Sequence, residues 1–408
     1  MMNLVNVAVG QSGGPTTVIN ASLYGVIKEA YANSDKIGKV YGMINGIEGF
    51  IDGKVIDIFN EMSDEDVELL KNTPSAYLGS CRYKLPSSME DSVYKMIFSK
   101  FKELNIQYFI YIGGNDSMDT VHKLSVYAKR TNSPVRIIGV PKTIDNDLAH
   151  TDHSPGYGSA AKYVATTVRD IVMDANVYDT HSVTIIELMG RHTGWITAAS
   201  VMARKYEGDN PVLIYLPEVV FDVKEFVNRV KQELNIRNNV IVCVSEGIKD
   251  SSGTFICEYA SKAGVDNFGH KMLTGCGKYL ENIIKDELGV KVRSVELNVN
   301  QRCKGALASL TDIEEAVMAG RKGVEMALAG ETGKMVAFVR EASEDYHIQY
   351  ESVECELVCN QEKMVPREWI SEEGTDILND FKEYVIPLIQ GESKATIENG
   401  LPKYCYRK

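Results

Sequence analysis

Two carboxylates, a lysine and a hydroxyl stand together in the run Pro-Lys-Thr-Ile-Asp-Asn-Asp at residues 141–147. A carboxylate such as Asp145 could accept a proton from a substrate hydroxyl, and Lys142 could offset the charge of a phosphate. The run directly follows the apolar residues 137–140, which are typical of a buried strand. Because a plain turn has no use for the lysine, the spacing favours a catalytic loop.

Two glycine-rich turns also join an apolar stretch to a helix-like stretch. Residues 10–15 (Gly-Gln-Ser-Gly-Gly-Pro) offer backbone N–H groups to an anion but match neither the P-loop nor the dinucleotide motif. Residues 113–117 (Gly-Gly-Asn-Asp-Ser) place Asn115 and Asp116 as oxygen ligands of the kind that Mg²⁺ prefers. We therefore expect a phosphate loop and a magnesium site, with a tight turn and a helix cap as the alternatives.

The elements that must position these residues alternate along the chain. Helix-like segments such as 16–31 and 117–129 separate apolar runs centred on residues 7–9, 108–112, 135–140, 183–188, 212–216 and 240–244. This alternation predicts parallel sheets covered by helices. Polar and glycine residues follow five of the predicted strands, at 11–14, 113–116, 141–147, 189–191 and 245–247. Ligands of such sheets bind beyond the carboxyl ends of the strands, so we expect one connected site.

The composition narrows the class of function. A chain of 408 residues exceeds what one hydrophobic core usually serves, which predicts two domains. A net charge of −12 makes nucleic acid and anionic membranes poor partners. No apolar run approaches the roughly 18 residues of a membrane span, and the first residues lack the features of a secretion signal. The eight cysteines include no C-x-x-C pair, which favours reduced thiols in the cytoplasm over a structural zinc site.

Four of these motifs resemble those of phosphofructokinases and occur in the same order. They are Gly-Gly-Asn-Asp-Ser at 113–117, Pro-Lys-Thr-Ile-Asp-Asn-Asp at 141–147, Met-Gly-Arg at 189–191 and Ser-Glu-Gly at 245–247. The similarity extends from the first strand to about residue 340, and the remaining tail is similar to that of the pyrophosphate-dependent branch.

The resemblance implies an α/β fold of two Rossmann-like three-layer domains with mostly parallel sheets. Residues 1–157, completed by about 303–345, would bind the phosphoryl donor. Residues 158–302, completed by about 346–408, would bind fructose 6-phosphate. The resemblance also implies a homodimer or homotetramer, in which one arginine of the sugar-phosphate site comes from the neighbouring subunit.

The resemblance further implies roles for individual residues. Asp145 matches the general base for the sugar 1-hydroxyl, and the catalytic set would be Asp145, Lys142, Asp116 and Arg191. The donor would contact Gly13, Gly14, Arg82, Gly114, Asp116 and Lys142. Fructose 6-phosphate would contact Thr143, Asp145, Asp147, Met189, Gly190, Arg191, Glu246, Arg293 and Arg302. Mg²⁺ would be held by Asn115 and Asp116.

Two positions bear on the identity of the donor. ATP-using relatives carry glycine where this chain has Asp116 and again where it has Lys142. A carboxylate at the first position would repel a nucleotide α-phosphate, and a lysine at the second would stabilise a leaving phosphate. The pair favours reversible transfer from pyrophosphate to fructose 6-phosphate, giving fructose 1,6-bisphosphate and phosphate in glycolysis or gluconeogenesis. The alternatives are an ATP-dependent or dual-donor enzyme, a nicotinamide-nucleotide kinase, and a sugar-phosphate sensor without activity.

Three departures from the family pattern affect details. Asn115 stands where most relatives have aspartate, which weakens its case as a metal ligand. Ser182 stands where bacterial ATP enzymes place an arginine that crosses to the next subunit. Tyr24 and Lys28 replace two arginines of the allosteric effector site, which argues against regulation by nucleotides there.

Overall fold

The computed structural model describes residues 4–259, 275–343 and 345–407. The chain divides into two compact units. The first comprises Met1–Ser159, Arg302–Gln361 and Gln390–Lys408, and the second comprises Ala160–Gln301 and Glu362–Ile389. The chain therefore passes between the units four times, and each unit is built from segments that are far apart in the sequence.

The first unit is built on a seven-stranded sheet. Its order is β11 (Ile348–Glu354), β10 (Lys334–Arg340), β5 (Arg136–Pro141), β4 (Ile106–Gly113), β1 (Val5–Gln11), β2 (Ile37–Met43) and β3 (Val55–Asp57). The five inner strands are parallel, whereas β11 and β3 pair antiparallel at the two edges. The central strands β5, β4 and β1 are mostly apolar and buried because helices cover both faces of the sheet.

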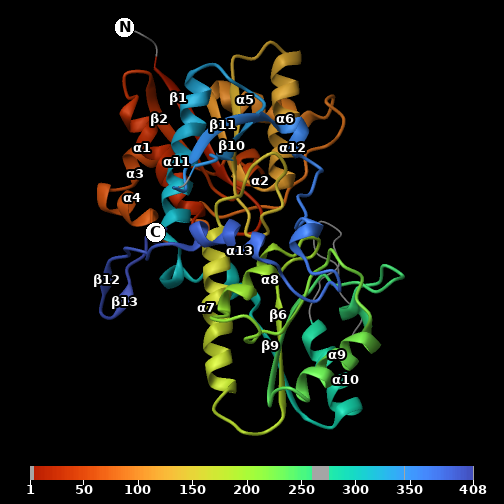
Figure 1. The fold of residues 1–408 in the computed structure, drawn as a ribbon. Helices are drawn as coiled ribbons and strands as arrows, with labels where there is room; N and C mark the ends of the chain where they lie inside the picture. The colour runs from red at the N-terminus through yellow and green to blue at the C-terminus, as the bar shows by residue number, and fades with distance from the viewer. Residues whose placement is uncertain (1–3, 260–274, 344, 408) are drawn as a thin grey trace. The chain divides into compact units, whose positions relative to one another are not determined.

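Helices form a layer on each face of this sheet (Figure 1). On β1, Val7 and Val9 join the core beneath α1 (Ile19–Ala32) and α11 (Leu310–Leu328), whereas Ala8 joins the core beneath α5 (Ser92–Glu103) and α6 (Asn115–Arg130). The unit also contains α2 (Gly46–Ile51), α3 (Ile58–Glu61), α4 (Asp64–Leu70), α12 (Cys355–Val358), η4 (Gly305–Leu307) and the short hairpin β12 (Ile397–Glu398) and β13 (Leu401–Pro402).

Helices α1 and α11 approach each other at two glycines. A Cβ on Gly25 would lie 2.0 Å from the carbonyl oxygen of Val317, and a Cβ on Gly320 would lie 2.0 Å from that of Ser22. Any side chain larger than hydrogen would therefore force the two backbones apart. The helix that follows the first glycine-rich loop is thus packed directly against the backbone of α11.

The second unit is built on a parallel four-stranded sheet. Its order is β7 (Leu213–Tyr215), β8 (Asn239–Ser245), β6 (Ser182–Leu188) and β9 (Lys291–Glu296). Apolar side chains of α9 (Val223–Leu234) and α10 (Cys276–Leu288) join those of the sheet in one core. The remaining elements are α7 (Tyr157–Ala175), which starts in the first unit, and α8 (Trp195–Ala198), η1 (Ala199–Ala203), η2 (Ile256–Tyr259), η3 (Asn298–Arg302), η5 (Arg367–Trp369), α13 (Asn379–Val385) and η6 (Ile386–Ile389).

The fold class expected from the sequence is confirmed, and strands occupy all six predicted positions. The expected assignment of the C-terminal tail to the second domain is wrong in part. Residues 346–361 belong to the first unit because β11 extends its sheet, and residues 390–408 return to it as well. None of the described helices is both long and apolar enough to span a membrane.

Candidate active site

Lys142 follows β5 and points back to the first glycine-rich loop. Its side chain is 4% exposed, and its Nζ donates a hydrogen bond to the carbonyl oxygen of Gly14 across 2.7 Å. A Cβ on Gly13 would lie 3.2 Å from the same Nζ, so the absence of a side chain there leaves room for the ammonium group. The first glycine-rich loop and Lys142 are therefore in direct contact, although 128 residues separate Lys142 from Gly14.

Four of the predicted site residues carry charges that act on Lys142, itself a predicted site residue. Burial lowers the pKa of the Lys142 ammonium to about 8, and the carboxylates of Asp145 and Asp147 oppose this effect. The guanidinium groups of Arg82 and Arg302 lower the same pKa further. Two carboxylates and two guanidinium groups thus lie within electrostatic range of Lys142, in a chain whose net charge is −12.

The loop that carries the two carboxylates folds back on itself. Thr143 Oγ1 accepts a hydrogen bond from the backbone N–H of Asp145 (3.0 Å), and Asn146 Oδ1 accepts one from the N–H of Ser154 (3.1 Å). Asn146 is fully buried and left-handed, with a φ of 54°, a conformation that asparagine tolerates better than most residues. These contacts hold residues 143–147 in one conformation before any substrate arrives.

A buried ion cluster anchors the far end of this loop. His153 Nε2 lies 2.6 Å from a carboxylate oxygen of Glu315 on α11, and its Nδ1 lies 2.8 Å from one of Asp152. Arg340 of β10 pairs with Asp152 (2.9 Å), and the Tyr346 hydroxyl donates to Glu315 (2.5 Å). Burial opposes the charge on the imidazole, but the two carboxylates outweigh it and raise the pKa of His153 to about 9.

The first glycine-rich loop contacts the segment that carries Arg82. The N–H of Gly13 donates to the carbonyl oxygen of Cys81 (3.1 Å), and Ser80 Oγ donates to that of Gly13 (2.6 Å). Gly13 has a φ of 77°, which favours glycine. A Cβ on Gly14 would lie 3.4 Å from a guanidinium nitrogen of Arg302, so this arginine, predicted to bind the sugar phosphate, lies beside the donor loop.

The second glycine-rich loop separates the expected roles of Asn115 and Asp116. The Asn115 amide oxygen accepts from the N–H of Asn360 (2.6 Å), and its amide nitrogen donates to the carbonyl oxygen of Gln361 (2.5 Å). Asp116 instead forms an ion pair with Lys84 across 3.3 Å, and about half of each side chain is exposed. Asn115 therefore holds the C-terminal tail, while the Asp116 carboxylate remains accessible to a ligand.

In the second unit, the loops after β6 and β8 contact each other. The N–H of Gly190 donates to Glu246 Oε1 (3.4 Å), and Ser245 Oγ donates to the carbonyl oxygen of Gly190 (2.5 Å). The N–H of Met189 donates to the amide oxygen of Gln301, a buried residue that the sequence analysis did not identify. Gly190 has a φ of 136°, so the Met-Gly-Arg turn depends on its glycine.

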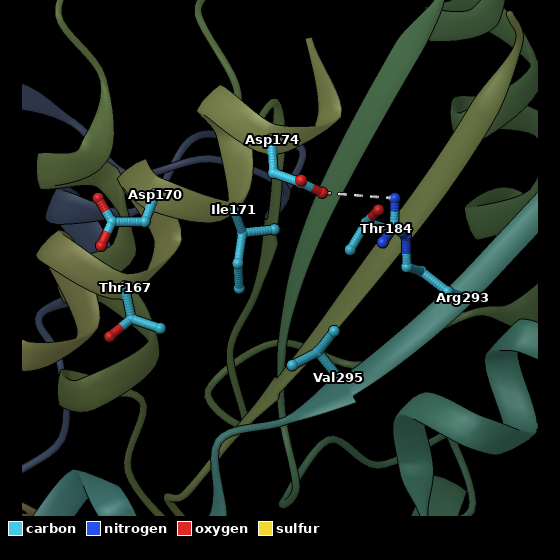
Figure 2. A pocket seen from close by; sticks show the side chains of 7 residues that line it. All are labelled: Thr167, Asp170, Ile171, Asp174, Thr184, Arg293 and Val295. Carbon is cyan, nitrogen blue, oxygen red and sulfur yellow. Dashed lines mark ion pairs between the residues drawn. The ribbon is translucent and has the colours of Figure 1, made fainter. Parts of the chain in front are cut away.

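Arg293 lies away from these loops, on β9. It pairs in register with Thr184 of β6, four residues before the strand end at Leu188, which corresponds to roughly 13 Å. Figure 2 shows its guanidinium group directed towards Asp174 of α7, and the closest nitrogen and oxygen are 3.7 Å apart. The two residues line a cavity of about 280 Å³ together with Thr167, Asp170, Ile171, Thr184 and Val295.

The site residues could hold Mg²⁺ only if bound phosphates supplied further ligands. Among the described residues, no group of three or more histidine, cysteine, aspartate or glutamate side chains could hold a metal ion. Mg²⁺ often binds through one or two carboxylates together with water and substrate phosphates, and the accessible carboxylate of Asp116 suits that arrangement.

Comparisons with known proteins find related sequences and a related structure. The model of the family described as Phosphofructokinase matches residues 6–327. The pyrophosphate–fructose 6-phosphate 1-phosphotransferase of Halomonas elongata is 42% identical, covering 98% of this chain and 95% of its own, and that of Methylococcus capsulatus is 39% identical with the same coverage. The crystal structure of the pyrophosphate-dependent phosphofructokinase from Marinobacter aquaeolei is 38% identical with a TM-score of 0.89, covering 98% of this chain and 96% of its own.

Proposed function

This chain belongs to the phosphofructokinase family, and we propose that it transfers a phosphoryl group reversibly between pyrophosphate and the 1-hydroxyl of fructose 6-phosphate. The products of the forward reaction are fructose 1,6-bisphosphate and phosphate. The contact between Lys142 and Gly14 carries this proposal, because it fixes a buried cation on the donor loop. The names of the relatives that match nearly the whole chain support the same donor and acceptor.

The donor preference rests on two side chains. Lys142 places its charge where the phosphate that leaves pyrophosphate develops negative charge. Asp116 places a carboxylate beside the second glycine-rich loop, where it repels a third phosphate group. Both effects favour a donor with two phosphates over a nucleoside triphosphate.

The transfer itself needs a base and a set of cations. Asp145 accepts the proton of the sugar 1-hydroxyl as the oxygen attacks the phosphorus of the donor. Lys142, Arg82 and Arg302 supply positive charge for the transferring phosphoryl group, and we assign the same role to Arg191. Little other covalent chemistry is required, since positioning and electrostatics account for most of the catalysis of phosphoryl transfer.

The acceptor is held by the loops that follow β6 and β8. We assign the sugar to Met189, Gly190 and Arg191, and a sugar hydroxyl to Glu246, whose carboxylate faces the Gly190 N–H. Thr143 and Asp147 position the acceptor beside the base.

Mg²⁺ is the cofactor in this proposal. When bound, the ion neutralises part of the charge of the donor phosphates. Asp116 is the proposed protein ligand, because the amide of Asn115 is already bonded at both ends to the tail.

The 6-phosphate completes the assignment. Arg302 and Arg293 are its proposed ligands, with Arg293 contributed by a second copy of the chain in a homodimer or homotetramer. The distance of Arg293 from the strand end at Leu188 supports this division, because the arginine cannot reach the Met-Gly-Arg turn of its own unit from the middle of β9. We place the enzyme in the cytoplasm, in glycolysis or gluconeogenesis.

A comparison of donors tests the proposal. Purified protein is supplied with fructose 6-phosphate and Mg²⁺, and either pyrophosphate or ATP, and fructose 1,6-bisphosphate is measured. We expect turnover with pyrophosphate to exceed turnover with ATP by at least a hundredfold in kcat/KM. The same preparation of Asp145→Asn serves as the control for contaminating kinases. Equal or better use of ATP would reject pyrophosphate as the physiological donor.

A further inference from the structure

The C-terminal peptide 403–407 lies on the outer side of the segment 73–78. The N–H of Cys405 donates to Thr73 Oγ1 (2.9 Å), and an Nη1 hydrogen of Arg407 bonds to the carbonyl oxygen of Leu78 (3.3 Å). Cys405 is 5% exposed and joins the apolar core beneath α1. Cys405 and Arg407 therefore both attach the peptide to the first unit.

Two buried amides hold the inner side of the same segment. Asn20 Nδ2 donates to the carbonyl oxygen of Thr73 (3.0 Å), and Asn20 Oδ1 accepts from the N–H of Tyr77 (2.9 Å). Gln11 Oε1 accepts from the N–H of Leu78 (2.9 Å), and its Nε2 donates to Asn20 Oδ1 (2.8 Å). Both amides are fully buried. Thr73 and Leu78 are thus each held from two sides, by the amide pair and by the tail.

The segment held in this way leads directly into the donor-binding residues. It continues into residues 79–82, where Ser80 and Cys81 bond to the backbone of Gly13 and Arg82 follows. The N–H of Ser75 also donates to the carbonyl oxygen of Thr16, one turn before α1. An unbroken series of hydrogen bonds therefore connects the C-terminal peptide to the donor loop.

We propose that residues 403–407 are a positioning element of the donor site, which acts through segment 73–78 on Gly13 and Arg82. The proposal rests on the assignment of these two residues to the phosphoryl donor. The family match ends at residue 327, so it contains no information about this peptide. These hydrogen bonds lead from the peptide towards the donor loop, so its loss is expected to weaken the donor selectively.

Point variants separate positioning from simple stabilisation. Thr73→Val keeps the shape of the side chain but removes the hydroxyl, which accepts from Cys405 and donates to the carbonyl oxygen of Leu69 (2.8 Å), whereas Thr73→Ser retains that hydroxyl. Arg407→Met removes the bond to Leu78. The matched control is Lys403→Met, which removes only the surface ion pair with Glu65 from the same peptide. A truncation after residue 402 removes all of these contacts together.

Steady-state kinetics and calorimetry provide the readout. We expect Thr73→Val and Arg407→Met each to raise KM for pyrophosphate about five- to tenfold, the effect of one or two lost hydrogen bonds, with KM for fructose 6-phosphate within twofold of wild type. Binding of imidodiphosphate, measured by titration calorimetry, should weaken in parallel. Thr73→Ser and Lys403→Met should match wild type, and the truncation should exceed either point variant.

Other outcomes overturn the proposal. A lowered melting temperature with unchanged KM for pyrophosphate would mean that the peptide only stabilises the fold. An equal rise of both KM values would mean that its effect is not specific to the donor. Should wild type prefer ATP, the same variants measured with ATP still decide whether the peptide positions the donor site, so this failure is distinguishable from failure of the proposed donor.

Discussion

The ammonium group of Lys142 and the carbonyl oxygen of Gly14 are joined by a hydrogen bond of 2.7 Å. This bond links the ends of β5 and β1, two strands separated in the sheet by β4. The N–H of Lys142 also donates to the carbonyl oxygen of Gly113 at the end of β4 (3.0 Å). One residue thus ties three strand ends together, and its charge state is expected to control binding of the donor.

The pH dependence of the donor step should follow Lys142. Because burial lowers its pKa to about 8, the ammonium form dominates at pH 7 and is lost as the pH rises through about 8. We expect kcat/KM for pyrophosphate to decline across that range, while KM for fructose 6-phosphate stays flat. Lys142→Met provides the reference profile, since titration of pyrophosphate itself affects both proteins. Parallel profiles for the two proteins would contradict the prediction.

Donor choice should change when Asp116 and Lys142 are replaced by glycine. Asp116→Gly is expected to raise kcat/KM for ATP and to weaken the use of pyrophosphate. Lys142→Gly alone should cost about 10²–10³-fold in turnover with pyrophosphate and should not admit ATP, because Asp116 still repels it. The double variant should favour ATP by more than the two separate effects predict. Strict additivity, determined from kcat/KM for both donors, would show that the residues act independently.

Removal of the base should affect turnover far more than binding. Asp145→Asn preserves the size of the side chain and the hydrogen bond from its N–H to Thr143, but the amide cannot take the proton. We expect kcat to fall by about 10²–10⁴-fold with little change in KM for fructose 6-phosphate. A variant that retains most of its kcat would exclude Asp145 from this role.

Mixed oligomers should reveal whether Arg293 acts on a neighbouring subunit. Asp145→Asn and Arg293→Ala proteins are each expected to be inactive alone. After subunit exchange, some sites would combine an intact Asp145 with an intact Arg293, and activity should recover to a fraction of wild type. Native mass spectrometry confirms the exchange. Absence of recovery in confirmed mixed oligomers would mean that each chain completes its own site.

The His153 cluster should make stability decline at alkaline pH. Both ring nitrogens face carboxylates, an arrangement that requires the imidazolium form. With a folded pKa of about 9 against about 6.5 in the unfolded chain, its contribution is complete below pH 6.5 and is lost as the pH rises through 9. We expect this loss to be on the order of 3 kcal/mol in the free energy of unfolding, and denaturant titrations of His153→Gln should lack that slope.

Site residues that share one short motif could be predicted from the sequence, whereas contacts between residues far apart in the sequence could not. Lys142, Thr143 and Asp145 share one short loop after a recognisable strand, so their proximity follows from the motif itself. Asn115 resembles a metal ligand in its motif, but its partners lie 245 and 246 residues away. Gln301 supports Met189 across 112 residues. Local periodicity contains no information about such contacts.

The position of the C-terminal tail in the fold also depends on long-range contacts that the sequence does not predict. The strand β11 begins at the buried Ile348, and its other residues are exposed or partly buried, a pattern that does not specify which sheet it joins. Its place is decided by the open edge of β10, which only the assembled first unit provides. Segments 403–407 and 73–78 likewise meet through two backbone groups, the Thr73 hydroxyl and the Arg407 guanidinium, and no local sequence pattern pairs these groups.

The glycine contacts between α1 and α11 restrict how this family member could acquire a different donor. Because the two backbones already touch at Gly25 and Gly320, α1 cannot slide or tilt towards α11 to enlarge the space above the glycine-rich loop. A bulkier phosphoryl donor would therefore have to be accommodated by replacing individual side chains at the strand ends, while α1 keeps its position.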